Sequence, residues 1–433
     1  SLNTLKPGHQ WGAFPSAGIG WNLHKEKWFN VPAINAMKLR ATFGLNGSDG
    51  TGAYYRSGTG TLSNYYYNYL KYYGYPKNTN AYFGKTPAGN AILTESNMPY
   101  VVQWEKRTRW NAGVDMELFN HSLFVTAEYF HNNYSDGLSV PAGNGSNSVI
   151  GMTLPYQNIA KSRRSGLELD LTYNKKWNDF SFTASANATL YWTKILANGE
   201  NQYPEAYMQR VGEPISQIFG YVCDGFFQNQ EEIDQYPSIP DYEPQPGDLK
   251  YRDLNGDHVL DGKDVTGIGT RGPLVDYGIF LGAEWKGLAF SMQWSGRGNV
   301  QTTSKTMPFT SNAQGSYGQA LVEHLDYWTP ENRDASYPRL SIGNSYNERT
   351  STFWLQNASY LRLQNVEISY TLPQKWTKPI HISGLKFFVN GYNLLTICGI
   401  KDRDPELLSF TNGTSSGIIP NTKAYNVGIN IQF

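Results

Sequence analysis

Cysteine, net charge and long apolar runs are all scarce in this chain. Only two cysteines occur, Cys223 and Cys398, so no framework of disulfides holds the fold. The sequence leaves open whether they form a bridge in an oxidising compartment or stay as two thiols. The 36 basic and 36 acidic residues balance, which argues against the basic surface that a nucleic-acid partner needs. No run approaches the roughly 18 apolar residues of a transmembrane helix.

Catalytic motifs are missing as well. The seven histidines form no HExxH pattern and no metal-ligand spacing, and the chain contains neither GxSxG nor a phosphate-binding loop. The sequence therefore predicts no enzyme and no organic cofactor.

Strict alternation of apolar and polar residues is abundant instead. In "FSFTASANATLY", Phe180 and Leu190 fall on one face, and Thr183 and Asn187 fall on the other. This period of two predicts strands with one apolar and one polar face. About eleven segments show it, at 11–22, 36–45, 108–119, 123–133, 164–175, 179–191, 277–286, 288–295, 359–371, 384–394 and 423–433. Lengths near 10 residues match tilted strands that cross a membrane.

The connections between these strands alternate between short and long. Short ones are expected at 23–35, 119–122, 175–179, 286–287 and 372–383, and long ones at 46–107, 134–163, 192–276, 296–358 and 395–422. Short periplasmic turns at one end and long extracellular loops at the other are typical of outer-membrane barrels. The fold class predicted is therefore all-β, an antiparallel transmembrane β-barrel.

The last strand has a feature of its own. Tyr425, Val427, Ile429, Ile431 and Phe433 share one face, and the chain ends on the phenylalanine. A final amphipathic strand ending in Phe is the usual signal that outer-membrane assembly machinery reads. The alternative is a plain edge strand, which would invite aggregation in a soluble protein.

Taken together, the segments resemble the SusC/RagA family of TonB-dependent outer-membrane transporters of Bacteroidetes. The resemblance rests on phrases in order along nearly the whole chain: "FPSAGIGWNL" (14–23), "MKLRATFGLNG" (37–47), "RWNAGVDMELFNHSLFVTAEYF" (109–130), "NIAKSRRSGLELDLTY" (158–173), "VGEPISQIFGYVCDGFFQNQEEI" (211–233), "GDLKYRDLNGDHVLDGKD" (247–264), "LDYWTPENRDASYPRL" (325–340), "SYLRLQNVEISYTLP" (359–373) and "LKFFVNGYNLLTI" (385–397).

The resemblance implies a barrel of about 22 strands plugged by an N-terminal domain. This chain would supply about eleven strands, so residues 1–433 are expected to be the C-terminal half of such a barrel, without the plug. No signal peptide opens the chain, and residue 1 is expected to be an internal point of a longer or processed polypeptide. An N-terminal plug and barrel half, on the same or a separate chain, is then required, because lipid does not tolerate two unpaired strand edges.

The resemblance also implies a function in the outer membrane. The expected role is import of oligosaccharides or peptides, with a SusD-like lipoprotein on the extracellular face and TonB acting through the plug. The alternatives are a passive outer-membrane channel or scaffold, and a secreted β-rich glycan-binding protein.

A calcium-type segment lies within the long connection 192–276. Its ligand positions would be Asp253, Asn255, Asp257, the Val259 carbonyl, Asp261 and Asp264. It departs from the EF-hand pattern, because His258 replaces the glycine of the sharp turn and the last ligand is Asp rather than Glu. The alternatives are a structural Ca²⁺ that clips the extracellular loop and an Asx-rich turn that satisfies its own backbone.

A tyrosine-rich stretch at 54–76 is expected to be extracellular too. Tyrosine gives rigid, amphipathic contact area, as in antibody paratopes. The stretch could bind a sugar or peptide, contact the lipoprotein, or pack on itself above the rim. The residues concerned are Tyr65, Tyr66, Tyr67, Tyr69, Tyr72 and Tyr73.

Overall fold

The computed structural model describes most of the 433 residues. The described residues are 5–48, 73–74, 82–83, 86–87, 94–95, 101–139, 141, 157–272, 274–303, 322–341, 344–400, 404–407 and 421–433. Long antiparallel strands dominate them, and the eleven predicted strands are all present. Pairing joins these strands in the order β1-β2-β7-β8-β9-β10-β15-β16-β19-β20-β21, which follows the sequence and leaves β1 and β21 at its ends.

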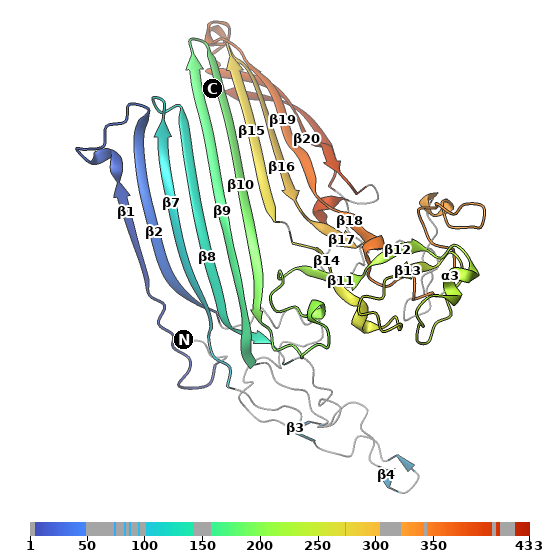
Figure 1. Cartoon of the computed structure of the whole chain (residues 1–433). Coiled ribbons are helices and arrows are strands. Elements are labelled where there is room, and N and C mark those ends of the chain that lie inside the picture. Colours follow the sequence, from blue (N-terminus) through green and yellow to red (C-terminus); the bar gives the residue numbers. More distant parts are fainter. Residues whose placement is uncertain are drawn as a thin grey trace. The chain divides into compact units, whose positions relative to one another are not determined.

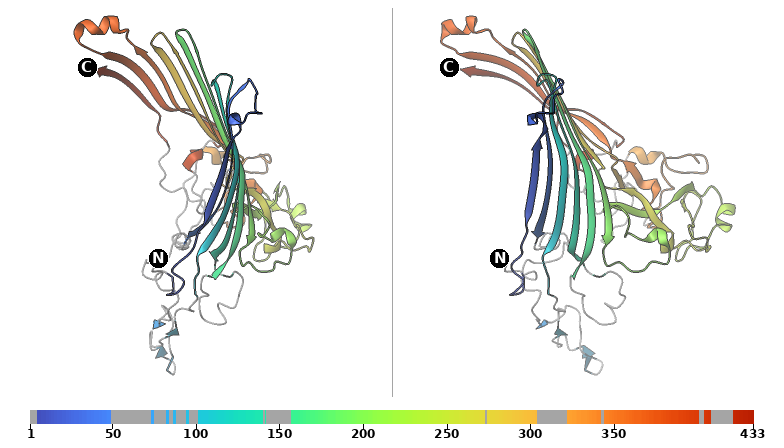
Figure 2. Two further views of the ribbon diagram at one scale, coloured as in Figure 1. Left: turned by 90° about the vertical axis from the view of Figure 1, so that its left-hand side faces the viewer. Right: turned by 60° about the vertical axis from the view of Figure 1, so that its left-hand side comes forward.

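The first compact unit contains the strands from β1 to most of β9. They are β1 (Ser16–Asn22), β2 (Ile34–Ser48), β7 (Glu105–Leu118), β8 (Leu123–Ser139) and β9 (Gln157–Trp177). They lie side by side in all views (Figures 1 and 2). The first strand begins at Ser16, later than the predicted residue 11. Pro15 precedes it, and proline cannot donate a backbone hydrogen bond to a neighbouring strand.

The second unit contains the strands from β15 onward. They are β15 (Val275–Trp285), β16 (Leu288–Gly298), β19 (Tyr360–Thr371), β20 (Gly384–Cys398) and β21 (Ala424–Gln432). Strand β10 (Phe180–Ala197) is divided between the two units. Cys223 and Cys398 both carry free thiols.

The short turns use residues that such turns require. Between β15 and β16, Lys286 and Gly287 have φ values of 49° and 87°. A two-residue hairpin of type I′ needs positive φ at both positions. The turn between β7 and β8 also carries positive φ, at Phe119, Asn120 and His121. Local turn chemistry therefore explains why adjacent strands pair at one end.

Each unit has one apolar face that is exposed. In the second unit, Phe290, Ile368, Val389 and Val427 stand opposite one another across β16, β19, β20 and β21, and all four are exposed. In the first unit, the strand register places Ile19 and Leu167 in one row across β1 and β9, and both are exposed. A soluble protein rarely leaves so continuous an apolar surface uncovered, and outer-membrane strands present it to lipid.

The remaining elements are short. The strands are β3 (Tyr73–Gly74), β4 (Tyr82–Phe83), β5 (Thr86–Pro87), β6 (Thr94–Glu95), β11 (Gln217–Tyr221), β12 (Cys223–Phe226), β13 (Leu249–Tyr251), β14 (Val265–Thr270), β17 (Gln301–Thr303) and β18 (Leu355–Asn357). The helical turns are η1 (Leu23–Lys25), η4 (Ala206–Met208), α3 (Gln230–Asp234), η5 (Gly262–Asp264), η6 (Val322–Leu325), η7 (Thr352–Trp354), α4 (Gln374–Thr377), η8 (Lys378–Ile380) and η9 (Pro405–Leu407). Among the described residues, no helix is long and apolar enough to traverse a membrane.

Candidate functional site

The predicted calcium-type loop folds around its own backbone. The carboxylate of Asp253 accepts hydrogen bonds from the backbone N–H groups of Gly256 (2.7 Å) and His258 (2.9 Å). Gly256 and His258 both have positive φ, so the backbone turns sharply although histidine stands at the sixth position. This is the geometry of an Asx-rich turn.

The end of the loop is capped in the same way. Asp264 is fully buried, and its two carboxylate oxygens accept from the backbone N–H groups of Leu254 (2.8 Å) and Asp261 (2.9 Å). Asp261 in turn accepts from the backbone of Lys263 at 2.7 Å, which completes a capping box at η5. The carboxylates of Asp253 and Asp264 thus hold the backbone at both ends of the loop.

A lysine supplies the positive charge beside these carboxylates. The Lys263 ammonium lies 2.7 Å from Asp257 and 3.6 Å from Asp261. Its hydrogen bond to Asp257 lowers the pKa of that carboxyl. No cluster of three metal-ligating side chains occurs in the described parts of the chain. The Ca²⁺ site at Asp253, Asn255, Asp257, Val259, Asp261 and Asp264 therefore stays a prediction.

The loop stands on a small core of its own. Leu249, Tyr251, Leu260, Tyr346 and Trp354 are buried together. The rings of Tyr251 and Tyr346 are 5.1 Å apart. We call these five residues the loop core.

A buried aspartate ties the loop core to a distant segment. Asp248 is 0% exposed, and its carboxylate binds the Arg339 guanidinium at 2.6 Å, the Asn347 amide at 2.9 Å and the Tyr242 hydroxyl at 2.7 Å. Burial, together with the hydrogen bond to Asp248, raises the pKa of Tyr242 to about 12. A buried carboxylate costs much solvation energy unless charged and polar partners surround it, as they do here.

The polar face of the first unit carries a charged cluster that sequence reasoning missed. Arg40 on β2 binds Asp115 on β7 at 3.2 Å and also pairs with Glu128 on β8. Glu128 is only 8% exposed and accepts a further hydrogen bond from Asn111 at 2.7 Å. Arg109 lies 4.0 Å from the same carboxylate. We call these five residues the wall cluster.

A groove adjoins the wall cluster. Its volume is about 550 Å³, and its lining includes Gly18, Thr42, Gly44, Arg109 and Asn111. Gly18 and Gly44 present no side chain to the groove, and Arg109 and Asn111 line it with polar groups that bond to Glu128 and to each other. The groove can therefore contact polar chains that pass along this face.

Most of the predicted tyrosine contacts fall outside the described residues. This holds for Tyr65, Tyr66, Tyr67, Tyr69 and Tyr72, whereas Tyr73 begins the two-residue strand β3. The predicted assembly signal lies on β21, where Tyr425, Val427, Ile429 and Ile431 are exposed, and Phe433 follows the strand. The roles of both sets stay predictions.

Long antiparallel strands with an exposed apolar face and a charged polar face define the class of outer-membrane β-barrels. The profile of the family described as TonB dependent receptor-like, beta-barrel matches residues 3–242. The chain belongs to this family, and its place is the bacterial outer membrane.

The relatives are more specific. TonB-dependent receptor P26 of Formosa agariphila is 24% identical over 97% of this chain and 42% of its own length. TonB-dependent receptor SusC of Bacteroides thetaiotaomicron is also 24% identical, over 98% of this chain and 40% of its own. A chain in the structure of the RagAB peptide transporter superimposes with a TM-score of 0.73 at 21% identity, over 100% of this chain and 44% of that one.

These matches confirm the resemblance to SusC and RagA. The chain spans less than half the length of the curated relatives that it matches. The barrel fold is therefore common to them, while the remaining length of the relatives has no counterpart in these 433 residues.

Proposed function

We propose that these residues form part of the barrel of a SusC-like, TonB-dependent importer. Residues 1–433 would supply the C-terminal half of the barrel, and the 192–276 connection would be extracellular. The cargo would be an oligosaccharide or a peptide that passes along the polar face of the strands. The relatives are named as receptors or a transporter, which favours transport over catalysis.

The observation that carries the proposal is the contrast between the two faces of the first unit. One face exposes Ile19 and Leu167, and the other holds the wall cluster and its groove. Charged side chains on the lipid side of a barrel are costly, so the wall cluster belongs to the interior. The donors of Arg109 and Asn111, which bond to Asn111 and Glu128 here, would exchange those hydrogen bonds for bonds to a polar cargo.

Two observations favour the partners proposed here: the ends of the strand order, which have no neighbour among the described residues, and the relatives. Strands β1 and β21 end the order, and membrane-spanning sheets must close because lipid offers no hydrogen bonds. An N-terminal plug and barrel half would complete the barrel. A SusD-like lipoprotein would cover the extracellular face, and TonB would act through the plug.

A direct test places an obstacle in the groove. A Cβ added at Gly44 meets Ser16 at 3.4 Å, an ordinary contact, and residue 44 lines the groove, so Gly44→Trp is chosen to project an indole into it. Ala41→Trp is the matched control, since residue 41 lies on the same strand and on the opposite, apolar face. Cells that lack the native gene would carry the full-length protein, its Gly44→Trp form or its Ala41→Trp form at equal outer-membrane levels.

Uptake of fluorescently labelled peptide and oligosaccharide mixtures is the readout. We expect uptake by the parent protein to cease when the proton gradient or TonB is removed. We expect Gly44→Trp to reduce uptake severalfold and Ala41→Trp to leave it unchanged. Uptake that persists without TonB would favour the passive channel, and equal uptake by both variants would refute the path along this face.

A further inference from the structure

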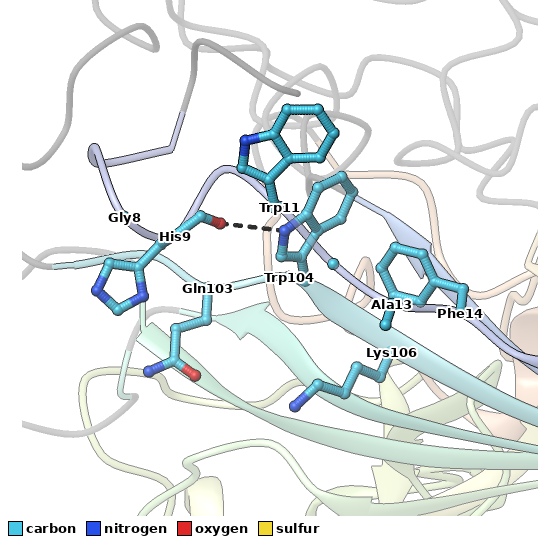
Figure 3. A pocket seen from close by; sticks show the side chains of 9 residues that line it. Gly8, His9, Trp11, Ala13, Phe14, Gln103, Trp104 and Lys106 are labelled. Carbon is cyan, nitrogen blue, oxygen red and sulfur yellow. Dashed lines mark hydrogen bonds between the residues drawn. The ribbon is translucent and has the colours of Figure 1, made fainter.

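A second cavity lies on the other face of the first unit, outside the proposed transport path. It has a volume of about 380 Å³, and its lining includes Trp11, Phe14, Gln103, Trp104 and Lys106 (Figure 3). The segment before β1 contributes one side, and the start of β7 contributes the other. We call this cavity the outer pocket.

The strand register places the outer pocket on the apolar face. Phe43 pairs with Trp110 across β2 and β7, and both side chains are exposed. In the same pair of strands, Lys106 pairs with Gly47. Lys106 is four residues before Trp110 on β7, and Gly47 is four residues after Phe43 on β2. Since strand side chains alternate with a period of two, these two pairs lie on one face.

The outer pocket also lies at the end of the strands where the long connections are. Strand β2 ends at Ser48 and β7 begins at Glu105, so this end is joined by the long connection 49–104. In outer-membrane barrels this end is extracellular, and aromatic girdles mark the membrane interface there. The outer pocket therefore opens where the outer leaflet meets water.

Its aromatic walls are held in place by the fold. The Trp104 indole N–H donates to the His9 carbonyl at 3.1 Å, and the ring packs edge-on against Phe14 with centroids 5.2 Å apart. Phe14 lies so close to Gly47 that a Cβ there would have no room. Leu5 is 1% exposed and packs with Val102 in a small buried cluster, which holds the segment before Trp11 in place.

Trp11 is exposed beside these rings in the part of the chain that the structure describes. Its side chain is 81% exposed, although it stands between the anchors at Leu5 and Phe14. Tryptophan joins an apolar ring to a polar N–H and is favoured where one side of a ligand is apolar and the other is wet. Gln103 and Lys106 supply polar groups on the rim, and the Lys106 ammonium is 3.0 Å from Asp136.

The geometry points to a saccharide-binding site in the outer pocket. A pyranose ring has an apolar C–H face that stacks on an indole and a rim of hydroxyl groups that bonds to amides and ammonium groups. Pockets that combine aromatic walls with a few polar groups bind such ligands. The sugar can come from an outer-leaflet glycolipid, whose acyl chains would lie on the apolar face, or from a free saccharide.

The test uses the full-length protein in nanodiscs or detergent and three probes. They are lipid A carrying its core oligosaccharide, that core oligosaccharide released in free form, and phosphatidylethanolamine. Native mass spectrometry measures the affinity of each. Trp11→Ala removes the exposed indole, and Lys106→Met removes the ammonium as a second, independent variant. Trp28→Ala is the control, because Trp28 is another exposed tryptophan, in the turn at the opposite end of β1 and β2.

We expect Trp11→Ala to weaken saccharide binding about tenfold and Trp28→Ala to leave it unchanged. Lys106→Met should weaken it as well. Binding of the glycolipid alone would identify a membrane source, and binding of the free oligosaccharide too would extend the site to soluble sugars. The proposal is overturned if no probe binds, if phosphatidylethanolamine binds as well as the glycolipid, or if all three variants act alike. This test measures binding and not uptake, so its result does not decide whether the transport proposal is correct.

Discussion

Replacing Asp248 with alanine should open the loop core. The carboxylate is fully buried and holds Arg339, Asn347 and Tyr242, so its loss leaves a guanidinium and several donors without their acceptor. Breaking a buried ion pair costs about 3–5 kcal/mol. The Arg339 side chain keeps 24% of its surface exposed and can regain some water, which favours the lower end. We therefore expect local opening to become easier by about 3 kcal/mol, or about 150-fold.

Hydrogen exchange followed by mass spectrometry measures this opening without unfolding the barrel. Peptides covering 217–264 and 344–357 should lose protection in Asp248→Ala, while those from β7 and β8 should not. Asp224→Ala is the matched control, because Asp224 pairs with the largely exposed Arg252, and exposed pairs are worth about 0–1 kcal/mol. Protection that changes less than threefold in Asp248→Ala, or equally in both variants, would refute the assigned role of Asp248.

Three further outcomes are expected. Calorimetric titration of the full-length protein with Ca²⁺ should show binding, and Asp253→Asn should abolish it. Lys263→Gln should strengthen the binding, because the Lys263 ammonium competes with Ca²⁺ for the Asp257 carboxylate. If neither the parent nor Lys263→Gln binds Ca²⁺, the loop is an Asx-rich turn without an ion. Burial raises the pKa of Tyr242 to about 12, above the ordinary value of 10.0, so its contribution to loop stability is complete below pH 10 and is lost as the pH rises to about 12. Exchange protection of the loop core should fall in that window, and a loss near pH 8 would contradict the assignment. Removing the last aromatic ring by Phe433→Ala should lower the amount of barrel in the outer membrane severalfold, measured by surface labelling, whereas normal amounts would favour the plain edge strand.

The strands could be predicted because their cause is local. Alternation within each segment is enough to indicate β7 or β16, and positive φ at Lys286 and Gly287 follows from the tight turn. The ends of strands were harder to predict. Strand β9 begins at Gln157 rather than residue 164, because pairing with β8 continues beyond the apolar stretch.

The sites depend on contacts that no local pattern contains. Arg40 and Glu128 are 88 positions apart and meet only when three strands take their register. Trp11 and Trp104 line one pocket because the segment before β1 lies against the start of β7, and alternation within a segment does not predict such a contact. For the 253–264 loop, the sequence supplied both alternatives, and the structure added a local fact, the Lys263 ammonium among the carboxylates.

The register of three strands brings Arg40 and Glu128 together, because Arg40 pairs with Gly113 and Gly113 pairs with Glu128. A slip of one residue in β2 or β8 would move every charged side chain of that strand to the opposite face. Arginine on the lipid side costs about 2–4 kcal/mol at the bilayer midplane. The misaligned partner would also lose its counter-charge. The ion pairs of Arg40 with Asp115 on β7 and Glu128 on β8 thus penalise a sheet whose register has shifted.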